Sequence, residues 1–202
     1  MDTKPLQKNS GEKSLDQNFQ LNLLEAQIRE CFGRVVWTHK SHEKCCDIVN
    51  KRHSRIQIVQ IVLSTVITTG ILVTVFGEQY IIGVITALIS ALQIGVNSYV
   101  KGYDFGSIAQ KHSDAAVQLW NIRESYLSLL TDMKAKSLSF EEITSKRDQL
   151  QNGLSVIYSG SPRILSTGYN KVTKALKINQ ELTFSDDEID MLLPRELRKQ
   201  QP

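Results

Sequence analysis

Two uncharged, apolar segments follow each other in the middle of the chain, at residues 56–76 and 80–100. Each is about as long as the roughly 20-residue helix that crosses a bilayer. Because only Gly77, Glu78 and Gln79 connect them, the pattern predicts an antiparallel hairpin of two transmembrane helices. Two alternatives stay open, namely a hairpin buried in a soluble bundle and a pair of strands, which the many β-branched residues permit.

Polar side chains recur inside both segments at helical spacing, so that each set occupies one face of its helix. The members are Gln57, Gln60, Ser64 and Thr68 in the first segment and Thr86, Ser90, Gln93 and Asn97 in the second. Folding the chain about residues 77–79 predicts matching depths for Gln60 with Asn97, for Ser64 with Gln93, and for Thr68 with Ser90 or Thr86. Since lipid cannot satisfy polar groups, the two faces either bond to each other or line a hydrated path in an oligomer.

A row of small residues lies beside the polar face of the second segment: Gly83, Ala87, Ala91 and Gly95. Small side chains let helix backbones approach closely, so this row predicts a helix packing face and hence a homo-oligomer. Neither segment contains Asp, Glu, Lys or Arg, which argues against a proton relay or an ion-coupled transporter.

Apolar residues at steps of three and four predict helices on both sides of the hairpin. Three stripes carry this pattern: Leu21, Leu24, Ile28, Cys31 and Val35; Leu119, Ile122, Tyr126, Leu129 and Met133; and Ile143, Leu150, Leu154 and Ile157. Each stripe needs a partner, so the flanking helices are expected to form a bundle or coiled coil under the membrane. The sequence therefore predicts an all-α chain, a transmembrane hairpin with a cytoplasmic helical bundle.

The boundaries follow from capping and breaking residues. We expect a disordered N-terminus at 1–17, a cytoplasmic helix at 18–55 that continues into the membrane, cytoplasmic helices at 101–180, and an acidic tail with a short helix at 181–202. Ser139 and Glu142 form a predicted capping box, and the residues 160–162 end that helix. A further helix is expected from Arg163 to Gln180, and Ser185 with Glu188 would cap the last one.

The placement of charges along the chain predicts how the hairpin is oriented in the membrane, whereas the net charge does not indicate a function class. The net charge of +3 is uninformative, but Lys51, Arg52 and Arg55 precede the hairpin and Lys101 follows it, whereas the turn carries only an acid. The positive-inside rule then predicts a multi-pass membrane protein with both termini in the cytoplasm, and the resemblance described below implies the bacterial inner membrane. The odd number of cysteines and the lack of an apolar leader favour a reducing compartment for the soluble parts.

No nucleotide-binding loop, nucleophile elbow or zinc helix is recognisable, so we expect neither an enzyme nor a bound cofactor. His39, His42 and Cys46 share a helical face that could hold a soft metal, but one helix offers no distant fourth ligand, and no metal is predicted. Cys45 and Cys46 could instead be acylated, although they lie well before the membrane segment.

Basic residues outnumber acids between positions 134 and 177. They form either a solvated surface or a cytoplasmic site for phosphates, with Arg163 at the start of a helix. The candidates for such a site are Lys146, Arg147, Arg163, Lys171, Lys174 and Lys177. The acidic tail would compete with that ligand.

The stretches "THKSHEK", "SPRILSTGY" and "LLPRELR", placed around a charge-poor hairpin, resemble the SLATT family, the SMODS and SLOG-associating two-transmembrane effector domains of bacteria. The resemblance implies an effector encoded beside a nucleotidyltransferase or nucleotide sensor in antiviral systems. It implies that the protein oligomerises and permeabilises the membrane in response to a nucleotide or oligonucleotide signal. A non-conducting anchor or scaffold for a cytoplasmic partner is the alternative.

Overall fold

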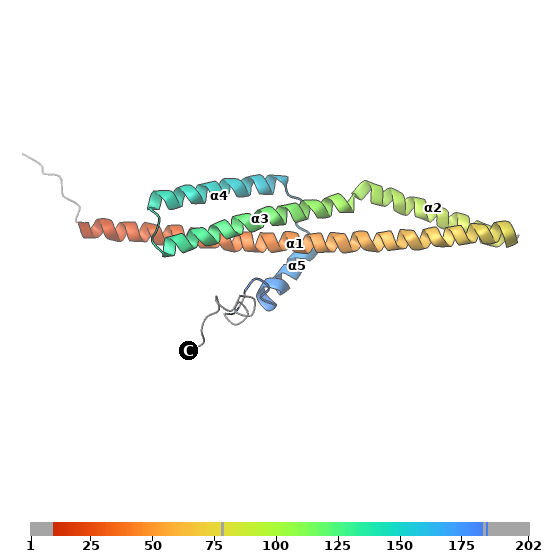
Figure 1. Cartoon of the computed structure of the whole chain (residues 1–202), viewed down its shortest axis with the longest axis horizontal. Helices are drawn as coiled ribbons and strands as arrows, with labels where there is room; N and C mark the ends of the chain where they lie inside the picture. The colour runs from red at the N-terminus through yellow and green to blue at the C-terminus, as the bar shows by residue number, and fades with distance from the viewer. Residues whose placement is uncertain (1–9, 78, 184, 186–202) are drawn as a thin grey trace, which may run out of the picture.

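The computed structural model describes residues 10–77, 79–183 and 185, with side chains from residue 17 onward. This part of the chain is helical and contains no strand, which confirms the all-α prediction. The elements are α1 (Ser10–Gly77), α2 (Tyr80–Tyr103), α3 (Phe105–Lys134), α4 (Phe140–Gly160), α5 (Ser166–Thr173) and the π-helical turn η1 (Lys174–Ile178). The molecule is elongated, and α1 runs along almost its whole length (Figure 1).

Helix α1 begins earlier than the sequence pattern indicates. It starts at Ser10, so residues 10–17, which were expected to be disordered, are helical. No glycine or proline occurs between Gly11 and Gly33, and extending an existing helix forms one hydrogen bond per residue without a new nucleus. The predicted continuity of the soluble helix with the first apolar segment is confirmed, since α1 has no break before Gly77.

Helices α1, α3 and α4 form a bundle whose core contains the three predicted stripes. Of these residues, Ile28, Val35, Leu119 and Tyr126 are fully buried, and the others are buried or packed against the same cluster. The exact match has a simple cause, because a stripe at steps of three and four can be covered only by a neighbouring helix. Figure 1 shows α4 against α3, on the other side of the bundle from α5.

Capping residues fix the two turns that shape the bundle. Asp104 adopts a left-handed conformation with φ of 30° between α2 and α3, and its carboxylate accepts a hydrogen bond from the Ser107 backbone N–H at 3.1 Å. Ser139 and Glu142 form the predicted capping box at the start of α4, with distances of 3.2 and 2.7 Å. Helix α4 ends at Gly160, the predicted break.

The hairpin of α1 and α2 extends beyond the bundle, and its apolar side chains face outward. The two helices are long and apolar enough to cross a membrane, and the most apolar 18-residue windows of these two spans are 0% and 6% buried. The core helix of a soluble protein would be mostly covered, so this exposure argues against the soluble-bundle alternative. Exposed Ile, Leu, Val and Phe side chains concentrate between positions 58 and 94.

Candidate functional site

The polar faces of the two apolar helices meet at the end of the hairpin nearest the bundle. Gln60 Nε2 donates to Asn97 Oδ1 at 2.8 Å, and Gln93 Nε2 donates to Ser64 Oγ at 2.6 Å. Both pairs were predicted, because folding the chain about residues 77–79 brings the two members of each pair to the same depth. These bonds join α1 to α2. They support the interpretation that the two polar faces bond to each other.

Close backbone packing replaces hydrogen bonds nearer the turn. Thr68 and Ser90, expected at matching depth, each donate to a carbonyl of their own helix, at 2.9 Å. The helices instead touch where Gly70 faces the buried Thr86 side chain and where Gly83 faces Thr74. A Cβ atom at Gly70 would collide with Thr86 Oγ1, so a glycine is required there.

The row of small residues does not act as one packing face within the chain. Gly83 belongs to the hairpin contact and also lines, with Ala87 and Ala91, an open groove of about 510 Å³. Nothing lies within 4 Å of a Cβ placed on Gly95. The outer part of the row is therefore exposed and accessible to another helix.

Several polar side chains of the hairpin stay exposed within its apolar surface. Gln57, Ser64, Thr68 and Asn97 are exposed, and Gln57 lines a shallow surface groove with Gln60 and Ser64. The Gln93 Oε1 atom is buried without a hydrogen bond. In a hydrocarbon environment such groups cost several kcal/mol each, on the order of the values for unsatisfied amides and hydroxyls.

The six predicted anion-binding residues do not converge on one site. Lys146 pairs with Asp132 at 3.3 Å, and Arg147 bonds to Asp148 at 2.7 Å and to Gln27 at 3.0 Å. Both lie on α4, whereas Lys171, Lys174 and Lys177 belong to α5 and η1 on the other side of the bundle (Figure 1).

Arg163 does not begin a helix, which corrects the sequence-based placement. Residues 162–165 are non-helical, and α5 starts at Ser166 behind the extended residue Leu165. The residue before α5, Leu165, is extended instead, and its backbone N–H donates to Cys45 Sγ on α1 at 3.3 Å. The predicted Ser185–Glu188 cap and most of the acidic tail lie outside the described residues.

Helix α5 docks on α1 at a position that the spacing of hydrophobic residues did not reveal. A Cβ on Gly168 would approach Cys45 Sγ to 2.7 Å, so the two helices touch there with no room for a larger side chain. Tyr169 packs on Trp37 with ring centroids 5.4 Å apart, and Lys177 lies 5.9 Å from the same indole. Cys45 is fully buried by this contact, and burial raises the pKa of its thiol.

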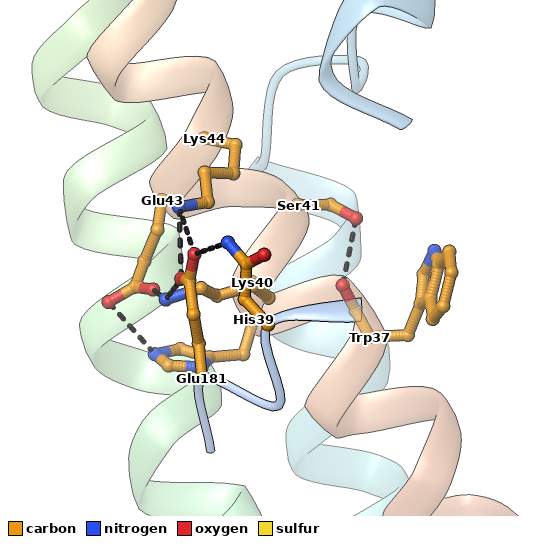
Figure 2. A network of polar contacts seen from close by, with 8 residues as sticks. Trp37, His39, Lys40, Ser41, Glu43, Lys44 and Glu181 are labelled. Atoms are coloured by element: carbon orange, nitrogen blue, oxygen red, sulfur yellow. Dashed lines mark hydrogen bonds and ion pairs between the residues drawn. The ribbon is translucent and has the colours of Figure 1, made fainter. Parts of the chain in front are cut away.

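A network of charges fixes the chain after η1 to the same face of α1 (Figure 2). Glu181 Oε2 lies 2.9 Å from Lys40 Nζ and 3.0 Å from Lys44 Nζ, and Lys40 also pairs with Glu43 at 2.8 Å. The hydrogen bonds from Lys40 and Lys44 lower the pKa of Glu181 to about 2. The four-residue spacing of the two lysines is the only sequence signal for this contact, and it does not identify the distant carboxylate.

The histidines of "THKSHEK" are used in packing. His42 Nδ1 lies 3.0 Å from His112 Nδ1 on α3, and both rings are buried. His39 Nε2 instead faces Glu43 at 3.7 Å. Among the residues that the structure describes, no three groups of the kind that hold a metal come together.

Similarity to known proteins is found at the level of a protein family. The chain matches no curated protein and no solved structure. A family model of two-transmembrane domains matches residues 24–188, from the start of the bundle core to beyond the docked segment. The chain therefore belongs to the SMODS and SLOG-associating 2TM effector domain family 4, within the SLATT group that its motifs resemble.

Proposed function

We propose that this protein is a pore-forming effector of a bacterial antiviral system. Family membership makes the chain a two-transmembrane effector of conflict and defence systems, with α1 and α2 as its candidate spans. The proposal adds that several hairpins assemble in the inner membrane and conduct ions. A nucleotide or oligonucleotide signal, or a partner nucleotidyltransferase, controls this conductance.

The exposed polar face of the hairpin is the observation that carries the proposal. A single hairpin leaves Gln57, Thr68 and Asn97 exposed within an otherwise apolar surface. Lipid offers no hydrogen bond to the Gln57 amide or to the rest of the Asn97 amide, so this side of the hairpin is better covered by another copy or by water. A ring of copies with this face inward provides both, and the exposed Ala87 and Ala91 beside it allow adjacent helices to pack closely.

Orientation follows from the charges that flank the hairpin. Lys51, Arg52 and Arg55 lie within α1 just before its apolar span, and Lys101 lies near the end of α2 just after the second span. The positive-inside rule then places the bundle and both termini in the cytoplasm. There, the cations of α5 and η1 are accessible to a phosphate-bearing signal.

A non-conducting scaffold is the second candidate, and one observation favours it. The Gln60–Asn97 and Gln93–Ser64 bonds already satisfy part of the polar face inside one chain. If the remaining groups pair in the same manner with a neighbouring copy, the assembly contains no water-filled path. It then conducts no ions and only localises a partner.

Single-channel recording of the full-length protein in planar bilayers separates the two functions. Thr68→Val removes a hydroxyl from the polar face, and Thr69→Val is its matched control, because each hydroxyl bonds only to a carbonyl four residues earlier, at 2.9 and 3.0 Å. An apolar constriction favours dewetting, so Thr68→Val should lower the conductance roughly twofold or more, while Thr69→Val leaves it unchanged.

The recordings are made with and without candidate nucleotides in the chamber on the bundle side. Equal amounts of each variant must be recovered in the membrane fraction. Wild-type protein that conducts under none of these conditions would assign the chain to the scaffold class.

A further inference from the structure

A large groove lies where the hairpin meets the bundle. Its volume is about 1050 Å³, and it is bounded by α1, α2 and one residue of α5. The groove is amphiphilic, because its walls are apolar on the membrane side and basic on the bundle side. This groove lies apart from the polar face on which the proposed pore depends, and it shares only Ala91 with the groove beside that face.

The apolar wall lies within the two spans. Ile56 and Val59 of α1 face it together with Leu92 and Val96 of α2. Gly95 contributes no side chain, and nothing lies within 4 Å of a Cβ placed there. The wall therefore has space for a hydrocarbon chain alongside α2.

Four cations line the end nearest the bundle: Lys51, Arg52, Arg55 and Lys171. None of them forms a salt bridge with an acidic residue in the described part of the chain. Arg52 is held in place, since its guanidinium donates to the Tyr99 hydroxyl at 2.8 Å and lies 5.0 Å from the Phe105 ring. A fixed guanidinium among uncompensated charges is suited to a phosphate.

We propose that this groove binds one anionic phospholipid from the leaflet that faces the bundle. The phosphate lies among the four cations, and one acyl chain follows the wall past Gly95. Basic pockets between membrane helices at the cytoplasmic surface are known to select anionic headgroups. The proposal requires membrane insertion of the hairpin and does not depend on pore formation.

Charge decides among the possible occupants. A second copy of the chain would bring its own basic end against the same four cations, and like charges in contact are unfavourable. A soluble phosphate would neutralise the cations but would leave the apolar wall uncovered. A phospholipid with a net negative charge does both, because its phosphate pairs with the cations and its acyl chain covers the apolar wall.

Native mass spectrometry counts the lipids that the full-length protein retains. The protein is released from nanodiscs of phosphatidylcholine with added phosphatidylglycerol. The double variant Lys51→Gln, Arg55→Gln should weaken phosphatidylglycerol retention roughly tenfold. The matched control Lys111→Gln, Lys134→Gln removes two exposed lysines of α3 that form no salt bridge with a described residue, and it should retain lipid as the wild type does. Gly95→Leu fills the wall without changing charge and should also displace the lipid.

Each alternative has its own result. Equal loss of phosphatidylglycerol in the double variant and its control would overturn the site, as would a wild type that retains none. Competition by glycerol 3-phosphate as strong as by phosphatidylglycerol would show a phosphate site without an acyl chain. A changed oligomeric mass in Gly95→Leu, with lipid retention intact, would show that a second copy occupies the groove.

Discussion

At the scale of single residues, Gly70 and Gly95 are both helical glycines within the spans, yet their surroundings differ completely. Gly70 meets the Thr86 side chain, and Gly95 meets nothing within 4 Å. Spacing alone predicted the pairs Gln60–Asn97 and Gln93–Ser64, because depth depends only on the position of the turn. It did not predict the Gly70–Thr86 contact, which depends on how far each helix is rotated about its axis.

A pair of alanine substitutions tests this contact. Gly70→Ala should destabilise the hairpin by about 1–3 kcal/mol through overpacking. Gly95→Ala, the control, should be neutral or stabilising by up to about 1 kcal/mol, since alanine favours the helix more than glycine does. Unfolding of the detergent-solubilised protein by titrated dodecyl sulfate measures both, and equal midpoints would contradict the predicted collision.

The buried His42–His112 pair makes the bundle sensitive to acid. Burial and the neighbouring His112 and His39 lower the pKa of His42 to about 4, and burial also lowers the pKa of His112. The unfolded chain, whose histidines have a pKa near 6.5, binds more protons below that pH than the folded chain does. Stability is therefore complete above about pH 6.5 and is lost as the pH falls toward 4.

We expect a lower melting temperature at pH 5.5 than at pH 7.5, followed by circular dichroism in detergent. Replacing both rings, His42→Leu with His112→Leu, should remove most of this difference, because no buried ring of the pair remains to be protonated. Glu181 does not contribute in this range, since its carboxylate titrates below its usual value of 4.5. An unchanged pH difference in the double variant would exclude the histidine pair as its source.

At the scale of elements, α1, α3 and α4 could be predicted from the sequence because each carries an apolar stripe, and the start of α4 because of its capping box, whereas the start of α1 was not predicted. Helix α5 could be predicted only in part. It starts at Ser166, and the extended residue before it, Leu165, contacts Cys45, a residue more than a hundred positions away. Such long-range contacts have no signature in local periodicity, and the Lys40–Glu181 pair was missed for the same reason.

The charge network should control how firmly α5 is docked. Glu181→Gln removes the carboxylate that joins Lys40 and Lys44, so α5 should lift from α1 more often. Cys45 is fully buried beneath α5 and reports this motion. In a Cys46→Ser background, alkylation of Cys45, followed by peptide mass spectrometry, should accelerate roughly two- to five-fold, as expected for a partly exposed ion pair.

Glu141→Gln serves as the control for the loss of one negative charge, because Glu141 is exposed on α4 and forms no salt bridge with a described residue. The same acceleration in both variants would mean that net charge, and not the docked contact, governs Cys45 reactivity.

At the scale of the whole molecule, the hairpin and the bundle were both predicted, and the family match confirms the resemblance. Both could be predicted because they are separate along the long axis of the molecule, and because the residues that pack in each part recur at regular spacing in the sequence. The direction in which this axis crosses the membrane rests on the flanking charges and stays a prediction.

Cysteine labelling in intact cells tests that direction. Gln79→Cys, at the start of α2, should react with a membrane-impermeant maleimide from outside. Lys111→Cys, an exposed position on α3, should react only after the cells are lysed. Labelling of Lys111→Cys in intact cells would reverse the proposed orientation.

The uninterrupted helix α1 has a mechanical consequence. Its 68 residues form a rod of roughly 100 Å that contains no proline, the commonest cause of a kink. The second span is instead connected to the bundle through the single left-handed residue Asp104. Torque applied to the bundle therefore turns the first span directly, while the second can lag behind it. The strain appears as shear between the two spans, across the Gln60–Asn97 and Gln93–Ser64 bonds.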